Sequence, residues 1–501
     1  MTGHINNFSP EVMQEIFLHC SSFGASAVPS RRSAPLNIAW VCSSWRNLAL
    51  SIPDLWAALE IGTVRGCVPD VAVLLHHWAK LSRDRPLSIT YNLPGNNLAN
   101  YRVLSAPLVP LTARLQHVHF RLEPQFYLSL LCGQPRIELP LLESLTLASH
   151  DALMLWVPPL GSVVNLCQCP LLRRVVLESI PHVHDAPSEA IFYRSIDMAV
   201  NINWSIVASL KIVEPRLCAA SAIRILAQCT LLAECELSVG YNSVPGNAMP
   251  HAVLPHLTSV SVEAQPAPHD QGTSGVVSIL NALTLPGLKT LVISAGWVLN
   301  EPVSATLLSL QQRSHFLLEH FSLSGSIDVI PLGMLFLAIP TLKTVSLHPY
   351  DQSIYRSLLL LLESPWPQND KLLLPHLHSL ELSAHALGIY ANSSGKLQYH
   401  MVLDHDVIHH YRRLSNLRSP MLFAMLRKRF RGSPNSKDGI VQLKNVTLRT
   451  FRSSEEVGCG DDQGLQQAWI DDDDEFRALQ STVQALKQQG IIVQFPVELI
   501  D

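Results

Sequence analysis

A short phrase of aliphatic residues recurs along most of this chain of 501 residues. Residues 340–347 show its form: a Pro or small residue, then Leu, two variable positions, an aliphatic, one variable position and another aliphatic. The final alternation has the period of a half-buried strand. Successive copies begin roughly 24 to 35 residues apart, and one strand per copy cannot bury its apolar face alone. Neighbouring copies must therefore stack, which predicts an α/β solenoid with a parallel sheet, an irregular leucine-rich-repeat fold.

Each copy of the repeat supplies three aliphatic or aromatic positions that we expect to face the core. They are Leu115/Val118/Phe120, Leu142/Leu145/Leu147, Leu172/Val175/Leu177, Val207/Leu210/Ile212, Leu232/Cys235/Leu237, Leu257/Val260/Val262, Leu288/Leu291/Ile293, Leu318/Phe321/Leu323, Leu342/Val345/Leu347, Leu377/Leu380/Leu382 and Leu443/Val446/Leu448. The leucine-rich-repeat template places Asn or Cys after the third of these positions, and neither residue occurs there in this chain. We therefore expect the curvature of the solenoid and the connectors between its strands to be irregular.

Composition supports a water-soluble repeat protein. Hydrophobic residues make up 48% and charged residues 15%, which provides ample material for a continuous core. A net charge of -4 argues against nucleic acid or an anionic membrane as the main partner. The ten Cys are scattered without a C-x-x-C pair, and the first residues do not resemble a signal peptide. We therefore expect a reduced protein of the cytoplasm or nucleus.

The sequence predicts helices in the first sixty residues. Ser9-Pro10-Glu11 is a helix start, and the residues after it place an apolar stripe on one face. Residues 21–35 read as a loop, and a second helix follows with Val41 and Trp45 on one face. Pro53 ends that helix, just before Leu55 and Trp56.

The order F-S-P-E-V-x-x-x-I-F, then A-P-L-x-x-A-x-V-C-x-x-W-R-x-L-A-L-S-x-P-x-L-W, resembles the F-box-like module common in mushroom-forming fungi. The resemblance covers residues 8–59 and departs from the pattern in its opening and in its long loop. It implies a three-helix module that docks on the Skp-family linker subunit of a cullin-type ubiquitin ligase. The implied contact residues are Pro10, Ile16, Val41, Cys42, Trp45, Leu48, Leu55 and Trp56. The alternative is plain core packing of an N-terminal cap, which a solenoid also needs.

We expect three regions along the chain: a helical module at 1–60, a linking segment at 61–110 and the solenoid at 111–501. The linking segment contains a predicted helix at 71–81 and a strand at 86–91, taken as the first of the sheet. Further helices are expected at 219–228, 276–283, 303–312 and 355–362. An insertion is expected around 385–440, followed by a last helix near 471–487 and a closing strand at 491–495.

The residues that alternate with the buried aliphatics should point to the open face of the sheet. They are mostly Ser, Thr and His with a few charged residues, which suits the binding of a protein partner. The candidate target-binding residues are Arg174, Glu178, Glu234, Glu236, Glu263, His320, His348, Glu381 and Arg449. The alternative is a solvated sheet face without a ligand.

No metal, cofactor or catalytic chemistry is expected. His400, His405, His409 and His410 form the densest histidine group, but no metal-ligand signature surrounds them. The basic residues of 412–431 are either a phosphate or nuclear-import contact or a solvated helix end. No phosphate-loop, zinc-protease or nucleophile-elbow motif is present, so we do not expect an enzyme.

These observations lead to one functional hypothesis and one alternative. The first is a substrate-receptor subunit that docks on a Skp-family linker and cullin complex and holds an unknown target protein on its repeat face. The alternative is a repeat-protein scaffold without ligase coupling.

Overall fold

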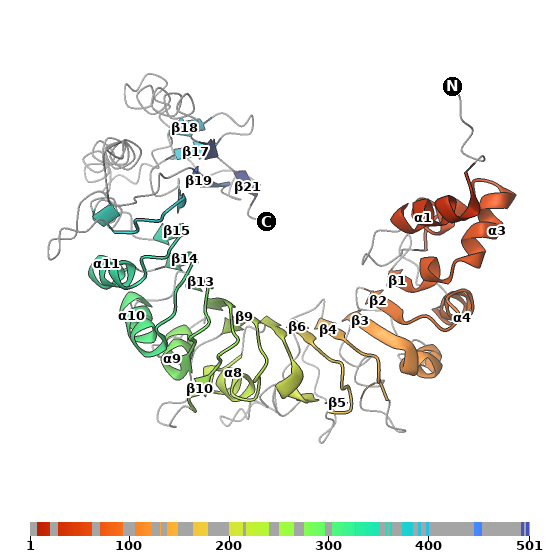
Figure 1. The fold of residues 1–501 in the computed structure, drawn as a ribbon, viewed down its shortest axis with the longest axis horizontal. Coiled ribbons are helices and arrows are strands. Elements are labelled where there is room, and N and C mark those ends of the chain that lie inside the picture. Colours follow the sequence, from red (N-terminus) through yellow and green to blue (C-terminus); the bar gives the residue numbers. More distant parts are fainter. Residues whose placement is uncertain are drawn as a thin grey trace, which may run out of the picture. The chain divides into compact units, whose positions relative to one another are not determined.

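The computed structural model forms two compact units, residues 1–240 and 241–501, each of mixed α/β structure with parallel strands. Their elements are shown in Figure 1. The described residues are 8–20, 29–62, 71–93, 106–122, 131, 138–148, 164–178, 200–213, 217–239, 250–264, 275–295, 303–325, 327–349, 357, 361–362, 373–383, 389–391, 397–399, 445–452, 492–494 and 497–499.

Unit 1 begins with short helices. They are α1 (Pro10–Cys20), α2 (Leu36–Ala39), α3 (Ser43–Ser51) and a 3-10 turn, η2 (Pro53–Trp56). Phe17 of α1 packs against Trp45 of α3, with ring centroids 5.0 Å apart. The Sγ atom of Cys42 accepts a hydrogen bond from the Trp45 backbone N–H and so caps α3. These helices match the predicted helical start of the chain, while their membership of the F-box family stays a prediction.

The sheet of unit 1 is parallel from one strand to the next. In order it comprises β1 (Ala58–Gly62), β2 (Leu87–Asn92), β3 (Leu115–Arg121), β4 (Ser144–Ala148), β6 (Arg174–Glu178), β8 (Ser209–Val213) and β9 (Glu234–Val239). Between these strands lie α4 (Val71–Leu81), η3 (Ala106–Arg114) and α8 (Ala219–Leu226), and β5 (Val164–Leu166) pairs with β7 (Val200–Ile202).

The expectation that residues 86–91 form the first strand is wrong. β1 precedes it and pairs with β2 in parallel, with Leu59 opposite Ile89. Leu59 and Ile61 alternate as strand residues do, but this strand directly follows η2, in the stretch that resembles the F-box-like module. β1 begins two residues after η2 ends.

The sheet of unit 2 repeats the same arrangement. Its parallel strands are β11 (Ser259–Ala264), β13 (Thr290–Ala295), β14 (His320–Gly325), β15 (Thr344–Pro349), β16 (Ser379–Ser383), β19 (Asn445–Arg452) and β20 (Ile492–Gln494). β21 (Val497–Leu499) also pairs with β19, β10 (Ala252–Val253) pairs with β12 (Leu283–Thr284), and β17 (Ile389–Ala391) with β18 (Leu397–Tyr399).

Helices α9 (Gly275–Ala282), α10 (Val303–Ser314) and α11 (Val329–Ala338) line one face of the unit 2 sheet and leave the other face open (Figure 1). The sequence predicted α9 and α10 but missed α11. That segment contains Pro331 and Gly333 and is apolar on nearly every side, so it shows no helical stripe. Asp328 begins the helix, because its carboxylate accepts a hydrogen bond from the Ile330 N–H at 3.2 Å.

One hydrogen-bond pattern marks the repeats. The backbone carbonyl just before a strand accepts hydrogen bonds from two successive N–H groups at the start of the next strand. In unit 2, Lys289 O accepts from Glu319 and His320, and Glu319 O accepts from Lys343 and Thr344. Glu143, Arg173 and Ala208 play the same role in unit 1. This recurrence keeps adjacent repeats in register.

The Pro of the repeat phrase occupies a turn. The N–H of Leu288 donates to the Leu285 carbonyl oxygen three residues earlier, across a turn that contains Pro286. Pro suits the second position of such a turn because its φ is already set. Leu142, Leu172, Leu257 and Leu377 close equivalent turns. The first and last residues of each turn are buried; both are Leu, except that Cys169 opens the turn closed by Leu172.

Hydrogen bonds from side chains to the backbone also join adjacent repeats. The Thr341 hydroxyl donates to the Leu318 carbonyl oxygen at 2.8 Å, and the Ser314 hydroxyl accepts from the Leu285 N–H at 2.9 Å. The Arg313 guanidinium donates to the Leu280 carbonyl oxygen at 2.9 Å, near the C-terminal end of α9. These bonds differ from repeat to repeat.

The core consists of the repeat aliphatics. Every predicted core position from Leu115 to Leu382 is buried. The prediction of stacked strands is confirmed for these repeats, because the periodicity and the burial coincide. Position 443, the histidine group at 400–410, the basic segment at 412–431 and the last helix at 471–487 lie outside the described residues. Within the described ranges no helix is both long and apolar enough to cross a membrane.

Candidate protein-interaction sites

The predicted docking residues of the helical module differ in exposure. Pro10 is exposed, and Val41 is 59% exposed. Four more are half-buried: Ile16, Cys42, Trp45 and Leu48. These six positions are accessible in whole or in part, so a partner can contact them directly.

Leu55 and Trp56, which the resemblance implies to be contact residues, lie in the core of the helical module. They are 2% and 1% exposed. The Trp56 Nε1 donates to the Ala49 carbonyl oxygen at 2.9 Å, and its ring lies against Trp78 of α4. A partner cannot reach either side chain in this arrangement, and both act by holding the module together.

Trp40 is a further accessible aromatic residue of the helical module. This residue follows α2 and is 55% exposed, with the Arg31 guanidinium 4.0 Å above its ring centroid. Phe8, Val12 and Leu50 are further exposed apolar residues of the same helical segment. The sequence signal was weak, because Trp40 lies off the apolar stripe that helical spacing defines.

The open face of unit 1 carries charged residues in register across the sheet. A single row runs Glu60, Thr90, His119, Thr146, Val176, Lys211 and Glu236. The Lys211 ammonium lies 3.4 Å from Glu178 and 3.2 Å from Glu236. Burial by itself would lower the pKa of Lys211, but hydrogen bonds and attraction from both carboxylates outweigh it and raise that pKa.

The four candidate residues of this face therefore do not form one site. Glu178 and Glu236 both form ion pairs with the Lys211 ammonium. The Glu234 carboxylate instead accepts a hydrogen bond from the Ser209 hydroxyl at 3.3 Å. Arg174 is exposed in the same row as Ser209.

Burial lowers the pKa of His119, while Glu178 and Glu60 oppose that shift and Arg121 adds to it.

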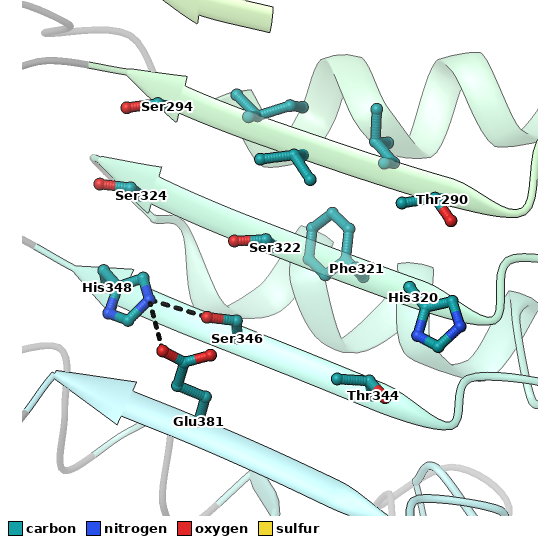
Figure 2. Close-up of a pocket in the computed structure, with 13 residues that line it drawn as sticks. Thr290, Ser294, His320, Phe321, Ser322, Ser324, Thr344, Ser346, His348 and Glu381 are labelled. Carbon is teal, nitrogen blue, oxygen red and sulfur yellow. Dashed lines mark hydrogen bonds and ion pairs between the residues drawn. The ribbon is translucent and has the colours of Figure 1, made fainter. Parts of the chain in front are cut away.

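The open face of unit 2 contains a depression of about 490 Å³ across four neighbouring strands, β13 to β16. Figure 2 shows hydroxyl side chains aligned along these strands, with two His and one Glu among them. The polar lining residues are Thr290, Ser294, His320, Ser322, Ser324, Thr344, Ser346, His348 and Glu381. We call this site the unit 2 depression.

Three of these side chains interact at one end of the depression. The Ser346 Oγ and the His348 Nε2 share a hydrogen bond of 2.7 Å, and a Glu381 carboxylate oxygen lies 3.9 Å from the same nitrogen (Figure 2). A catalytic triad requires the carboxylate on the other imidazole nitrogen, where it orients the base. Because Ser346 and Glu381 both approach Nε2, this geometry favours ligand binding over nucleophilic catalysis.

The remaining candidates lie apart from this group. His320 lines the other end of the depression, whereas the exposed Glu263 is on β11 and does not line it. The backbone of Arg449 on β19 is opposite Ser383 on β16, and its side chain lies outside the described structure. Among the residues that the structure describes, no cluster of His, Cys, Asp or Glu could hold a metal ion.

Comparison with known families, curated proteins and solved structures yields one weak structural likeness. No family model matches the sequence, and no curated protein matches it. Among solved structures, a chain of a crystal structure of the Rad7 and Elc1 complex in yeast is similar over 75% of this chain and 88% of that chain. The identity is 16% and the TM-score is 0.34. At these values the likeness identifies neither the family nor the function of this chain.

Proposed function

We propose that this protein is a substrate-receptor subunit of a cullin-type ubiquitin ligase. Its helical module would dock on a Skp-family linker, and its repeat face would hold a target protein. In this role the chain supplies no chemistry of its own. It raises the effective concentration of the target near the conjugating enzyme. Such a complex works in the cytoplasm or the nucleus.

The observation that carries this proposal is the exposure of two adjacent large apolar residues, Trp40 and Val41, which are 55% and 59% exposed. Large aromatic residues flanked by aliphatics are typical anchors of protein interfaces. Val41 is the first residue of the V-C-x-x-W-R motif on which the resemblance to F-box-like modules rests, and Trp40 directly precedes it. The exposure and the motif are independent observations, since motif matching does not use burial.

The test is binding of the purified full chain to a fungal Skp-family linker subunit, measured by pull-down and titration. Trp40→Ala/Val41→Asp should weaken binding at least tenfold and leave the melting temperature unchanged. Val73→Asp is the matched control, because Val73 is 62% exposed on α4 in the same unit. If the folded wild-type protein does not bind the linker, the proposal is contradicted.

The alternative is an interaction scaffold without ligase coupling. The burial of Leu55 and Trp56 favours it, because two of the eight implied contacts are then unavailable. The two functions share the repeat face and differ at the helical module. A scaffold would keep its target when the Trp40/Val41 pair is changed and would not bind the linker in any variant.

A further inference from the structure

The helical module of unit 1 has an excess of positive charge around its exposed aromatic residue. Residues 16–53 contain Arg31, Arg32 and Arg46 but no Asp or Glu, although the chain as a whole has a net charge of -4. All three Arg are exposed. Among the residues that the structure describes, none of the three forms an ion pair with a carboxylate. Their charges are therefore accessible to a partner.

Two of these Arg lie on a turn beside Trp40. The Ser33 N–H donates to the Ser30 carbonyl oxygen at 3.1 Å, and the Ser30 hydroxyl oxygen accepts from the Arg32 N–H at 3.2 Å. The guanidinium carbon of Arg31 lies 4.0 Å from the Trp40 ring centroid, in a cation–π contact. Trp40 is still 55% exposed, so the guanidinium covers only part of its ring.

The third Arg fixes the chain just before Trp40. The Arg46 Nε atom donates to the Ala39 carbonyl oxygen at 3.0 Å, which ties α3 to the end of α2. The Val41 N–H donates to the Ile38 carbonyl oxygen at 3.2 Å. Groups that are already held in place lose little conformational entropy when they bind. The exposed apolar pair is thus ready for a partner, with the basic turn beside it.

A partner that covers Trp40 also covers Arg31, because the two side chains are in contact. A guanidinium that leaves water without compensation costs free energy, whereas one that meets a carboxylate can form two parallel hydrogen bonds. An uncharged apolar groove would desolvate Arg31 without such compensation. A basic surface would be repelled by Arg31 and Arg32 together. Charge complementarity therefore favours an apolar pocket edged by Asp or Glu.

We propose that the helical module docks on a partner surface in which an acidic rim surrounds an apolar pocket. Trp40 and Val41 enter the pocket, and Arg31 and Arg32 pair with carboxylates of the rim. The inference rests on the proposed function, in which this partner is the linker subunit, and it states the chemistry that the linker must present. Charges at the rim of an interface mainly raise the rate of association and make that rate depend on salt.

The test is the association rate of the purified full chain with a fungal Skp-family linker subunit. For wild type this rate should fall at least about fivefold between about 0.1 M and about 1 M NaCl, because the screening length shrinks from about 10 Å to about 3 Å. Arg31→Glu/Arg32→Glu should associate at least about tenfold more slowly at the lower salt concentration. Lys80→Glu/Arg83→Glu is the matched control, because it changes the net charge equally at exposed positions outside the helical module.

A neutral variant separates loss of charge from loss of folding. Arg31→Gln/Arg32→Gln should slow association less than charge reversal does, with a melting temperature close to that of wild type. Linker binding whose rate does not depend on salt would overturn the proposal, and so would charge reversal that leaves the rate of a folded protein unchanged. Both of these outcomes leave linker binding itself intact. If folded wild type binds no linker at any salt concentration, the ligase role fails, and the acidic rim fails with it.

Discussion

Trp56 and Trp78 meet nearly edge to face, with ring centroids 5.1 Å apart and an interplanar angle of 70°. The Trp78 Nε1 also donates to the Ala58 carbonyl oxygen at 3.1 Å, at the start of β1. The pair therefore joins the helical start of the chain to α4 and to the first strand. A residue of the F-box-like motif thus serves as a structural link to the repeats.

Trp56→Ala should lower the free energy of unfolding of unit 1 by about 3–5 kcal/mol, because it opens a cavity in the core. It also removes the hydrogen bond to Ala49. Trp40→Ala should cost about 1 kcal/mol or less, since it removes mainly an exposed cation–π contact with Arg31. Denaturant unfolding of the full chain measures both. Equal losses would contradict the assignment of Trp56 to the core and Trp40 to the surface.

Gly287→Ala should destabilise unit 2 by about 1–3 kcal/mol. A Cβ atom at this position would lie 2.6 Å from the Pro255 backbone oxygen, so the backbones of adjacent repeats would have to separate. Gly62→Ala is the control, because its Cβ would lie 3.5 Å from the Asn92 oxygen, an ordinary contact. Thermal unfolding of the two variants should show a lower melting temperature for Gly287→Ala alone.

His119 should make the folded state sensitive to mild acid. Burial lowers its pKa in the folded protein, so its contribution is complete above the unfolded pKa of about 6.5. That contribution is lost as the pH falls through the lower folded pKa, because the unfolded chain then binds the proton more tightly. His119→Gln should flatten the dependence of melting temperature on pH below about 6.5. His117→Gln, exposed on the same strand, is the control for the substitution itself.

Thiol labelling should divide the described cysteines by burial. Burial raises the pKa of Cys229 to about 12, while Cys20 and Cys167 are exposed. At pH 8, a thiol with a pKa near 12 has a thiolate fraction roughly a thousandfold below that of an ordinary cysteine. Mass spectrometry after brief alkylation should therefore find Cys20 and Cys167 modified and Cys229 intact. Equal modification without unfolding would show that the core around α8 opens readily.

Several elements could be predicted from the sequence because their signal is local. The alternation of aliphatics in each repeat depends on which face of a strand a residue occupies, and that face is set by sequence spacing. Helices α4, α8, α9 and α10 likewise show a spacing of their own. β1 and α11 were not recognised, since β1 lies within the stretch that resembles the F-box-like module and α11 lacks a polar side. Both are stabilised by packing against neighbours distant in sequence.

By itself the sequence determined the repeat architecture, the core residues of each strand and the polar character of the open face. Only the tertiary structure decided which members of the F-box-like motif are accessible: Trp56 packs on Trp78, whereas Val41 faces solvent. It alone brought Glu381 of β16 beside His348 of β15. The reason is physical. Periodicity specifies the face on which a side chain lies, but its neighbours across strands depend on how successive repeats stack.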